Sequence, residues 1–174
     1  MYWWIKILGI AFLFACTSSP SDTQREKKAF DLPAYFRGEI KRLSATNRDI
    51  LKTVSKGNAS ETKTIQVDWE TELAAFASID LNKPVYAGYI RKDSSDNVVT
   101  FRMDNPAADI STVHIRYNED DEPSEITIHK KTDNLLYETI ETLYYRRNES
   151  YRIEKQQDVW LLGTNHYSIV GSLK

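Results

Sequence analysis

The chain has 174 residues, which fits a single domain with a sizeable core. Leu, Ile, Val and Phe account for 42 of these residues, above the roughly 20% below which a charged chain stays disordered. The 23 basic and 25 acidic residues are spread along the chain and give a net charge of -2. No basic stripe is available to neutralise phosphates, so we expect no nucleic-acid partner.

The first 16 residues, MYWWIKILGIAFLFAC, contain the longest apolar run of the chain. This run extends from Ile7 to Phe14 and follows the positive charge of Lys6. It is far shorter than the roughly 20 residues that a membrane-spanning helix needs, and it has the length of the apolar region of a secretory signal peptide. We therefore predict a signal peptide over residues 1–15.

The run ends in Leu13-Phe14-Ala15-Cys16, and Cys16 is the only cysteine of the chain. This stretch resembles the lipobox of bacterial lipoproteins, with Leu three positions before the cysteine and a small residue directly before it; Phe14 departs from the usual Ala, Ser or Thr. The resemblance implies cleavage before Cys16 and lipidation of its thiol, a stronger nucleophile than a hydroxyl at neutral pH. The alternative is an ordinary buried thiol at the end of a helix.

The residues after Cys16 are polar and lack a hydrophobic period, so we predict a flexible tether over residues 16–29. By resemblance to known lipoproteins, the absence of Asp directly after the cysteine implies the outer membrane and a periplasm-facing domain. Asp22 makes a poor version of the acidic export signal of Bacteroidota lipoproteins, and surface display remains an alternative. The layout as a whole resembles small Bacteroidota lipoproteins of unknown function.

The folded domain is predicted to occupy residues 30–174 and to begin with helices. Pro33 suits the first turn of a helix over about 33–44, with an apolar stripe at Phe36, Ile40 and Leu43. Gly57-Asn58 predicts a hairpin between alternating stretches, with a helical continuation as the alternative. Asp68 is a suitable N-cap for a second helix with its own apolar stripe. That stripe consists of Trp69, Leu73 and Phe76.

After Val85 the sequence alternates between polar and apolar residues in seven candidate strands with short links. No helix long enough for a parallel crossover separates them. We therefore predict an α+β fold, with one or two N-terminal helices packed on a curved antiparallel sheet of about six to eight strands. The charged segment NEDDEP, residues 118–123, is expected at a hairpin tip.

Two histidines are candidates for a shared site. If Tyr117 pairs with Ile126, His114 lies opposite His129 on the polar face of the sheet. Two ligands are too few for a dedicated zinc site, so we predict no metal and no cofactor.

Two other groups of side chains have structural explanations. Glu70 and Glu72 in the first turn of the second helix are expected to complement its dipole. Six aromatic residues of the last third are expected to fill the core or pair across the sheet, with a binding groove as the alternative. They are Tyr137, Tyr144, Tyr145, Tyr151, Trp160 and Tyr167.

No catalytic motif occurs, and no catalytic residue is predicted, although distant residues can still assemble a triad. The leading hypothesis is a non-enzymatic envelope module anchored to a membrane through lipid on Cys16, with another envelope protein as its partner. The alternative is a carrier or sensor of an apolar ligand held in a cavity of the sheet. An envelope hydrolase is the weaker third option.

Overall fold

The computed structural model describes residues 28–46, 48–105 and 107–173. The expected signal peptide, Cys16 and most of the tether lie outside the described residues. Within these ranges, no helix is both long enough and apolar enough to cross a lipid bilayer.

Two α-helices precede most of the sheet, and each begins at an aspartate. In α1 (Leu32–Ser44), the Asp31 side chain accepts a hydrogen bond from the Ala34 backbone N–H at 2.9 Å, and a proline occupies the first turn. In α2 (Trp69–Ala77), the Asp68 side chain accepts one from the Glu70 N–H. Both caps satisfy backbone donors that have no partner inside the helix. The two predicted helices are confirmed.

Within the described residues, nine strands form one antiparallel sheet, in the order β2-β1-β9-β8-β7-β6-β5-β4-β3. A 3-10 turn, η1 (Pro84–Tyr86), leads into β3. The strand bounds are β1 (Ile50–Lys56), β2 (Ala59–Ile65), β3 (Ile90–Ser95), β4 (Val98–Met103), β5 (Ile110–Tyr117), β6 (Pro123–Asp133), β7 (Tyr137–Arg146), β8 (Ser150–Val159) and β9 (Gly163–Leu173).

The expected number of strands was slightly too small. All seven strands predicted after Val85 are present, and the hairpin at Gly57 is confirmed as β1 and β2. This hairpin joins the same sheet because β1 pairs along its whole length with β9, from Ile50 opposite Leu173 to Lys56 opposite Tyr167. The pairing is long-range in sequence, and local patterns do not reveal it.

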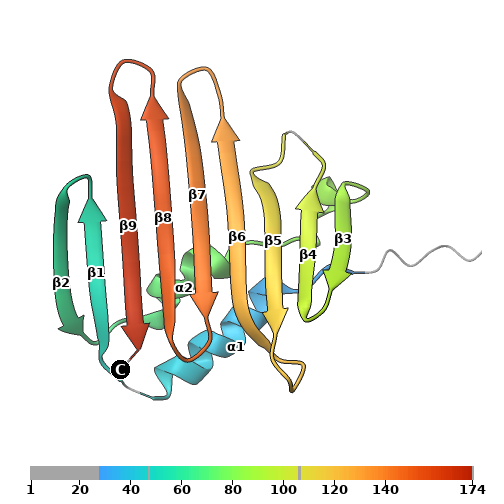
Figure 1. Ribbon diagram of the computed structural model, residues 1–174, viewed down its shortest axis with the longest axis horizontal. Coiled ribbons are helices and arrows are strands. Elements are labelled where there is room, and N and C mark those ends of the chain that lie inside the picture. Colours follow the sequence, from blue (N-terminus) through green and yellow to red (C-terminus); the bar gives the residue numbers. More distant parts are fainter. Residues whose placement is uncertain (1–27, 47, 106, 174) are drawn as a thin grey trace, which may run out of the picture.

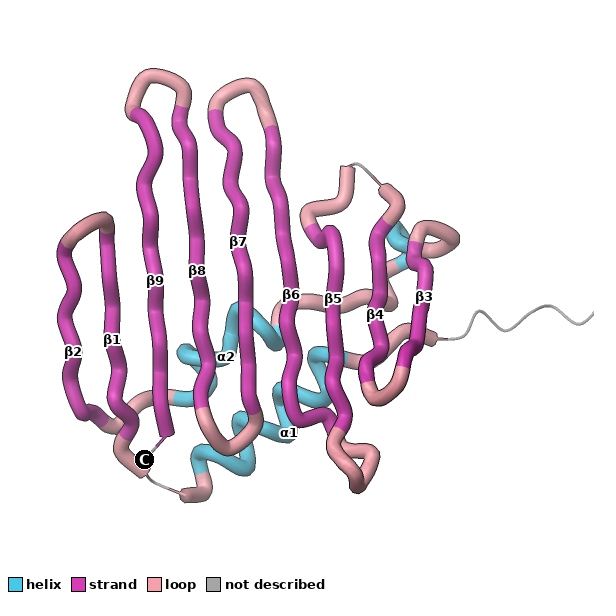
Figure 2. The backbone as a smooth tube through the Cα atoms, in the orientation of Figure 1, coloured by secondary structure: helices cyan, strands magenta, loops and turns pink. Residues whose placement is uncertain are grey.

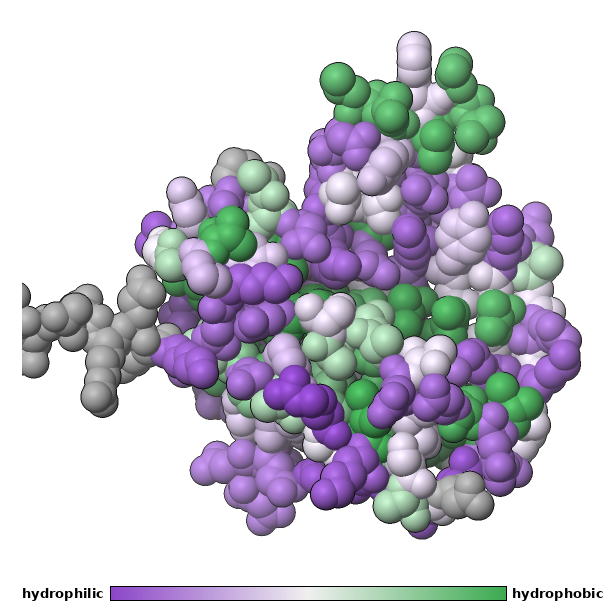
Figure 3. Space-filling model, turned by 180° about the vertical axis from the view of Figure 1, so that it is seen from behind, coloured by the Kyte–Doolittle hydropathy of each residue, from purple (hydrophilic) through white to green (hydrophobic). Residues whose placement is uncertain are grey.

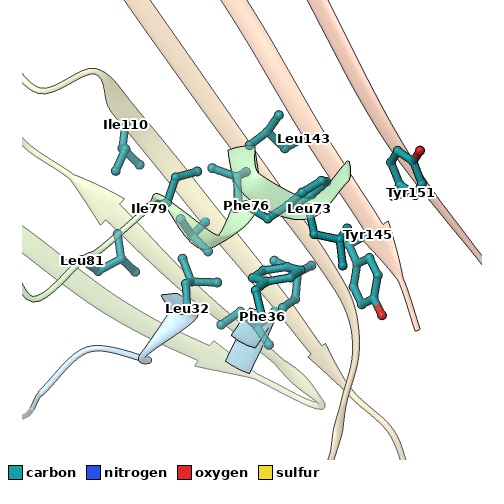
Figure 4. Packing of buried hydrophobic residues seen from close by; sticks show 14 of the residues in the cluster. Leu32, Phe36, Leu73, Phe76, Ile79, Leu81, Ile110, Leu143, Tyr145 and Tyr151 are labelled. Atoms are coloured by element: carbon teal, nitrogen blue, oxygen red, sulfur yellow. The ribbon is translucent and has the colours of Figure 1, made fainter. Parts of the chain in front are cut away.

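Both helices lie on one face of the sheet (Figure 1), and the space between the two layers is filled with apolar side chains (Figure 4). The predicted stripe of α2 is buried, and Phe36 and Leu43 of α1 are buried with it. Alternate side chains of the central strands complete the cluster, as expected for a sheet with one covered face. The fully buried ones are Val113, Ile115, Ile126, Ile128, Leu143, Tyr145 and Tyr151.

A buried carboxylate connects α1 to the sheet. Glu39 accepts hydrogen bonds from the Tyr145 hydroxyl on β7 and from Nε and Nη2 of Arg42, the latter two at 2.9 and 2.6 Å. Burial alone would raise the pKa of Glu39, but these hydrogen bonds and the charges of Arg42 and Arg147 outweigh it and lower the pKa. Glu39 is therefore a charged, paired group inside the fold.

A second buried carboxylate connects α2 to the sheet in the same way. Glu72 accepts hydrogen bonds from the Tyr151 hydroxyl on β8 and from Lys52 Nζ on β1, the latter at 2.6 Å. Burial, followed by the hydrogen bond to Glu72, raises the pKa of Tyr151. Glu72 thus has a structural contact in addition to its place in the first helical turn. The Tyr151 ring lies over Gly171, where an added Cβ would be 2.1 Å from Cε1 of the ring.

Candidate functional site

The face of the sheet opposite the helices is polar, and it carries the two candidate histidines. Their predicted pairing was wrong, because His114 lies opposite Thr127, while His129 lies opposite Thr112. Ile126 pairs with Ile115, two residues before the Tyr117 assumed in the prediction. The rings still meet diagonally, with their centroids 6.0 Å apart.

Threonine hydroxyls hold both imidazole rings. The Nδ1 atom of His114 is 3.0 Å from Thr100 Oγ1, and that of His129 is 3.2 Å from Thr142 Oγ1. Partial burial, the neighbouring imidazole and Arg102 lower the pKa of His114. Among the described residues, no three His, Cys, Asp or Glu side chains come together as a metal-ligand set. The pair therefore forms part of a polar surface.

The most unusual surface feature lies at the end of the sheet farthest from the helices. The β6–β7 and β8–β9 hairpins extend past their neighbours at this end (Figure 2). Their turns carry five large apolar side chains that are 67% to 97% exposed, whereas single exposed apolar residues are normal on protein surfaces. We call this group the apolar crown. It consists of Leu135, Leu136, Trp160, Leu161 and Leu162.

Backbone hydrogen bonds fix the shape of the apolar crown. In the β6–β7 turn, the Asn134 side chain accepts from the N–H groups of Leu136 and Tyr137 at 2.9 and 3.1 Å. The Trp160 N–H donates to the Leu136 carbonyl at 3.1 Å and so connects the two turns. Below them, β7 and β8 pair from Tyr137 opposite Val159 onward. The crown is therefore an ordered platform of two connected turns.

Polar rows separate the apolar crown from the hydrophobic core. On the helix-side face, the last apolar row contains Leu143 paired with Ile153. The next row pairs Glu141 with Lys155, and the row after it pairs Thr139 with Gln157. Figure 3 shows the same separation, with the hydrophobic tips in green above a mostly hydrophilic band. The crown is not an extension of the core, and its side chains add little to the stability of the fold.

The backbone at Leu161 supports this conclusion. Its φ angle is +93°, in the region that favours glycine or asparagine and is unfavourable for a branched side chain. The neighbouring Gly163 also has positive φ, at +79°, and suits such a turn well. A leucine at position 161 thus costs conformational energy and gains no burial. Such a combination in a turn points to a role outside folding.

The apolar crown has a large capacity for burial in a contact. Fully burying one leucine side chain contributes about 1.5–3 kcal/mol, so its four leucines together offer about 5–10 kcal/mol at their observed exposure. The entropy lost when a binding surface becomes ordered reduces the binding free energy. This loss is smallest where the surface is already fixed before binding, as it is here. The arrangement is suited to binding an apolar surface without chemical conversion.

The aromatic residues of the last third have more varied environments than we expected. Tyr145 and Tyr151 are in the core, in agreement with the prediction. On the polar face, the Arg146 guanidinium carbon lies 5.6 Å from the centroid of the Tyr144 ring. On the helix-side face, Lys56 Nζ lies over the Tyr167 ring. Only Trp160, together with the adjacent Tyr137, belongs to the tips of the hairpins.

Sequence reasoning missed the apolar crown as a site. Trp160 was expected to fill the core or pair across the sheet, and no role was assigned to the four leucines of the crown. The available signal was an apolar cluster directly beside turn residues, with Asn134 before one pair and Gly163 after the other group. No protein-family model matches the chain, and searches of curated proteins and of solved structures find no significant similarity.

Proposed function

We propose that this protein is a lipid-anchored component of a bacterial cell envelope that acts as a non-enzymatic binding module through the apolar crown. The observation that carries the binding role is the set of five exposed apolar side chains on two connected turns, separated from the core by polar rows. Because these residues add little to the stability of the fold, a contact outside the chain accounts for them best.

The lipobox-like Leu13-Phe14-Ala15-Cys16 supports the anchoring role. Diacylglyceryl on the Cys16 thiol, with a further acyl chain on the new amino terminus, would give more than the single chain that binds membranes only marginally. In this proposal the anchor is in the outer membrane, and the domain faces the periplasm. The anchor determines location, and the crown determines what is contacted.

The anchor and the crown are tested separately in cells of the source bacterium. The Cys16→Ala variant should keep the mass of the unprocessed chain and carry no acyl chain, because both steps need the thiol. A variant that is still processed as the wild type is would contradict the anchor.

For the crown, a photo-crosslinking amino acid replaces Leu161, and a matched control places it at Val85, which is also exposed. Adducts formed at position 161 and absent at position 85 are expected. Equal crosslinking at both positions would contradict a binding role for the crown.

A further inference from the structure

We infer that the apolar crown inserts into the surface of a lipid bilayer, so that the sheet stands on the tips of its β6–β7 and β8–β9 hairpins. This inference rests on the proposed binding role of the crown and identifies its partner as lipid. It is independent of the lipid on Cys16, because the crown is a separate part of the chain.

The shape of the crown favours a bilayer over a second protein surface. The crown is the end of a single sheet, four strands or about 15 Å wide and about 10 Å thick. Its convex turns need a partner that can surround them, which a fluid lipid layer does without a complementary cavity.

The residue types of the crown suit the boundary between lipid and water. Trp160 is the residue type that concentrates at this boundary, because its ring is apolar and its N–H remains near polar groups. Leu135 and Leu161 are the most exposed of the five, and they belong to different turns. Both hairpins can therefore enter the lipid together.

The charges next to the crown indicate an apolar mode of binding. Asp133, Glu138 and Asp158 flank the turns, against one cation, Lys131, which is 2.6 Å from Glu138 and 3.8 Å from Asp133. This acidic excess does not attract anionic lipid headgroups. Insertion is consequently expected into uncharged phosphatidylcholine as well, without loss of binding at high salt.

The chain between the anchor and the fold allows both attachments in one membrane. Twelve residue steps separate Cys16 from Lys28, where the described chain begins, and they span at most about 40 Å. The ten residues of β8 cover about 33 Å. The tether is long enough to let the lipidated end and the hairpin tips reach the same bilayer. The crown would then set the orientation of the domain.

The test uses residues 22–174, because the buried cluster of the described residues lies between Ala29 and Leu173. This chain keeps two tryptophans, the buried Trp69 and the exposed Trp160. Phosphatidylcholine vesicles with brominated acyl chains quench tryptophans that enter the lipid. We expect co-sedimentation with the vesicles and quenching that disappears in Trp160→Phe, a variant that should still bind.

Leu161→Asn is the variant that separates binding from folding. Asparagine is compatible with the positive φ at this position, so the thermal midpoint should stay the same or rise. Partitioning into vesicles should fall about 10-fold or more, since one inserted leucine is lost. Val85→Asn removes an exposed apolar side chain outside the crown and should leave partitioning unchanged.

Three results would overturn the inference. The first is the absence of vesicle binding by the folded chain. The second is binding that Leu161→Asn leaves intact, or that about 0.5 M NaCl abolishes. The third is a dimer in sedimentation velocity that dissociates in Leu161→Asn, which would make a second copy the partner. If vesicles do not bind while position 161 crosslinks to a protein in cells, the inference fails and the proposed binding role stands.

Discussion

Tyr145→Phe tests whether the buried carboxylate of Glu39 connects α1 to the sheet. The change removes one hydroxyl and leaves the ring among Tyr35, Phe36 and Phe76, whose centroids lie 5.3 to 6.4 Å from it. A hydrogen bond to a charged group contributes about 1.5–3 kcal/mol. Glu39 keeps its contacts with Arg42, so we expect the free energy of unfolding to fall by an amount at the low end of this range, about 1.5–2 kcal/mol.

Urea unfolding followed by far-ultraviolet circular dichroism measures this loss. With a denaturant dependence of about 1–3 kcal/mol per molar urea, the midpoint should fall by roughly 1 M. Tyr89→Phe is the control, because Tyr89 is exposed and should give no change. A loss below about 0.5 kcal/mol, or one equal to the control, would refute the role assigned to the Glu39–Tyr145 pair.

The same variant predicts a dependence on pH. The pKa of Glu39 is lowered in the folded state, so its charged form contributes stability above the ordinary carboxyl pKa, and this contribution is lost as the pH falls through the folded value. The difference in free energy of unfolding between wild type and Tyr145→Phe should therefore be largest at neutral pH and become smaller in acid. A difference that grows in acid would contradict the assignment of a charged Glu39.

Two further predictions concern the glycines and the histidines. Gly171→Ala should destabilise the fold by about 1–3 kcal/mol, because its Cβ would collide with the Tyr151 ring. Gly38→Ala in α1 has free space around the added Cβ and should stabilise the fold by about 0.5–1 kcal/mol; equal effects of the two variants in thermal unfolding would contradict this. His114 should titrate below 6.5 by NMR, and His129→Ala should raise its midpoint by removing one of the groups that lower it; an unchanged midpoint would contradict their coupling.

Most of the fold follows from local patterns in the sequence. The apolar stripes and aspartate caps locate both helices, and alternation locates the seven strands after Val85. The register between β5 and β6 could not be predicted from alternation, because a shift of two residues leaves the alternation unchanged and the turn sets the pairing. There the Asn118 side chain accepts hydrogen bonds from the N–H groups of Asp120 and Glu122 at 3.0 and 2.8 Å, and Tyr117 pairs with Pro123.

The candidate site was harder to predict, because exposure is not encoded by residue type. Leu135-Leu136 matches the beginning of a strand as well as it matches a turn, and only the lengths of the paired strands show that these residues extend past the core. The partners of Glu39 and Glu72 were missed for a related reason. They lie 106 and 79 residues away along the chain, beyond the range of any helical or strand period.

The pairing of β1 with β9 has a consequence for the order in which the protein folds. β1 and β2 come early in the chain, yet among the described strands only β9 connects this hairpin to the other six. The hairpin must therefore wait until β9 has been synthesised before it gains its place in the sheet. Folding is slow where segments far apart in the sequence must pair, so we expect the sheet to be completed only after the whole chain has been synthesised. Until then, the edge of β1 that pairs with β9 stays unpaired.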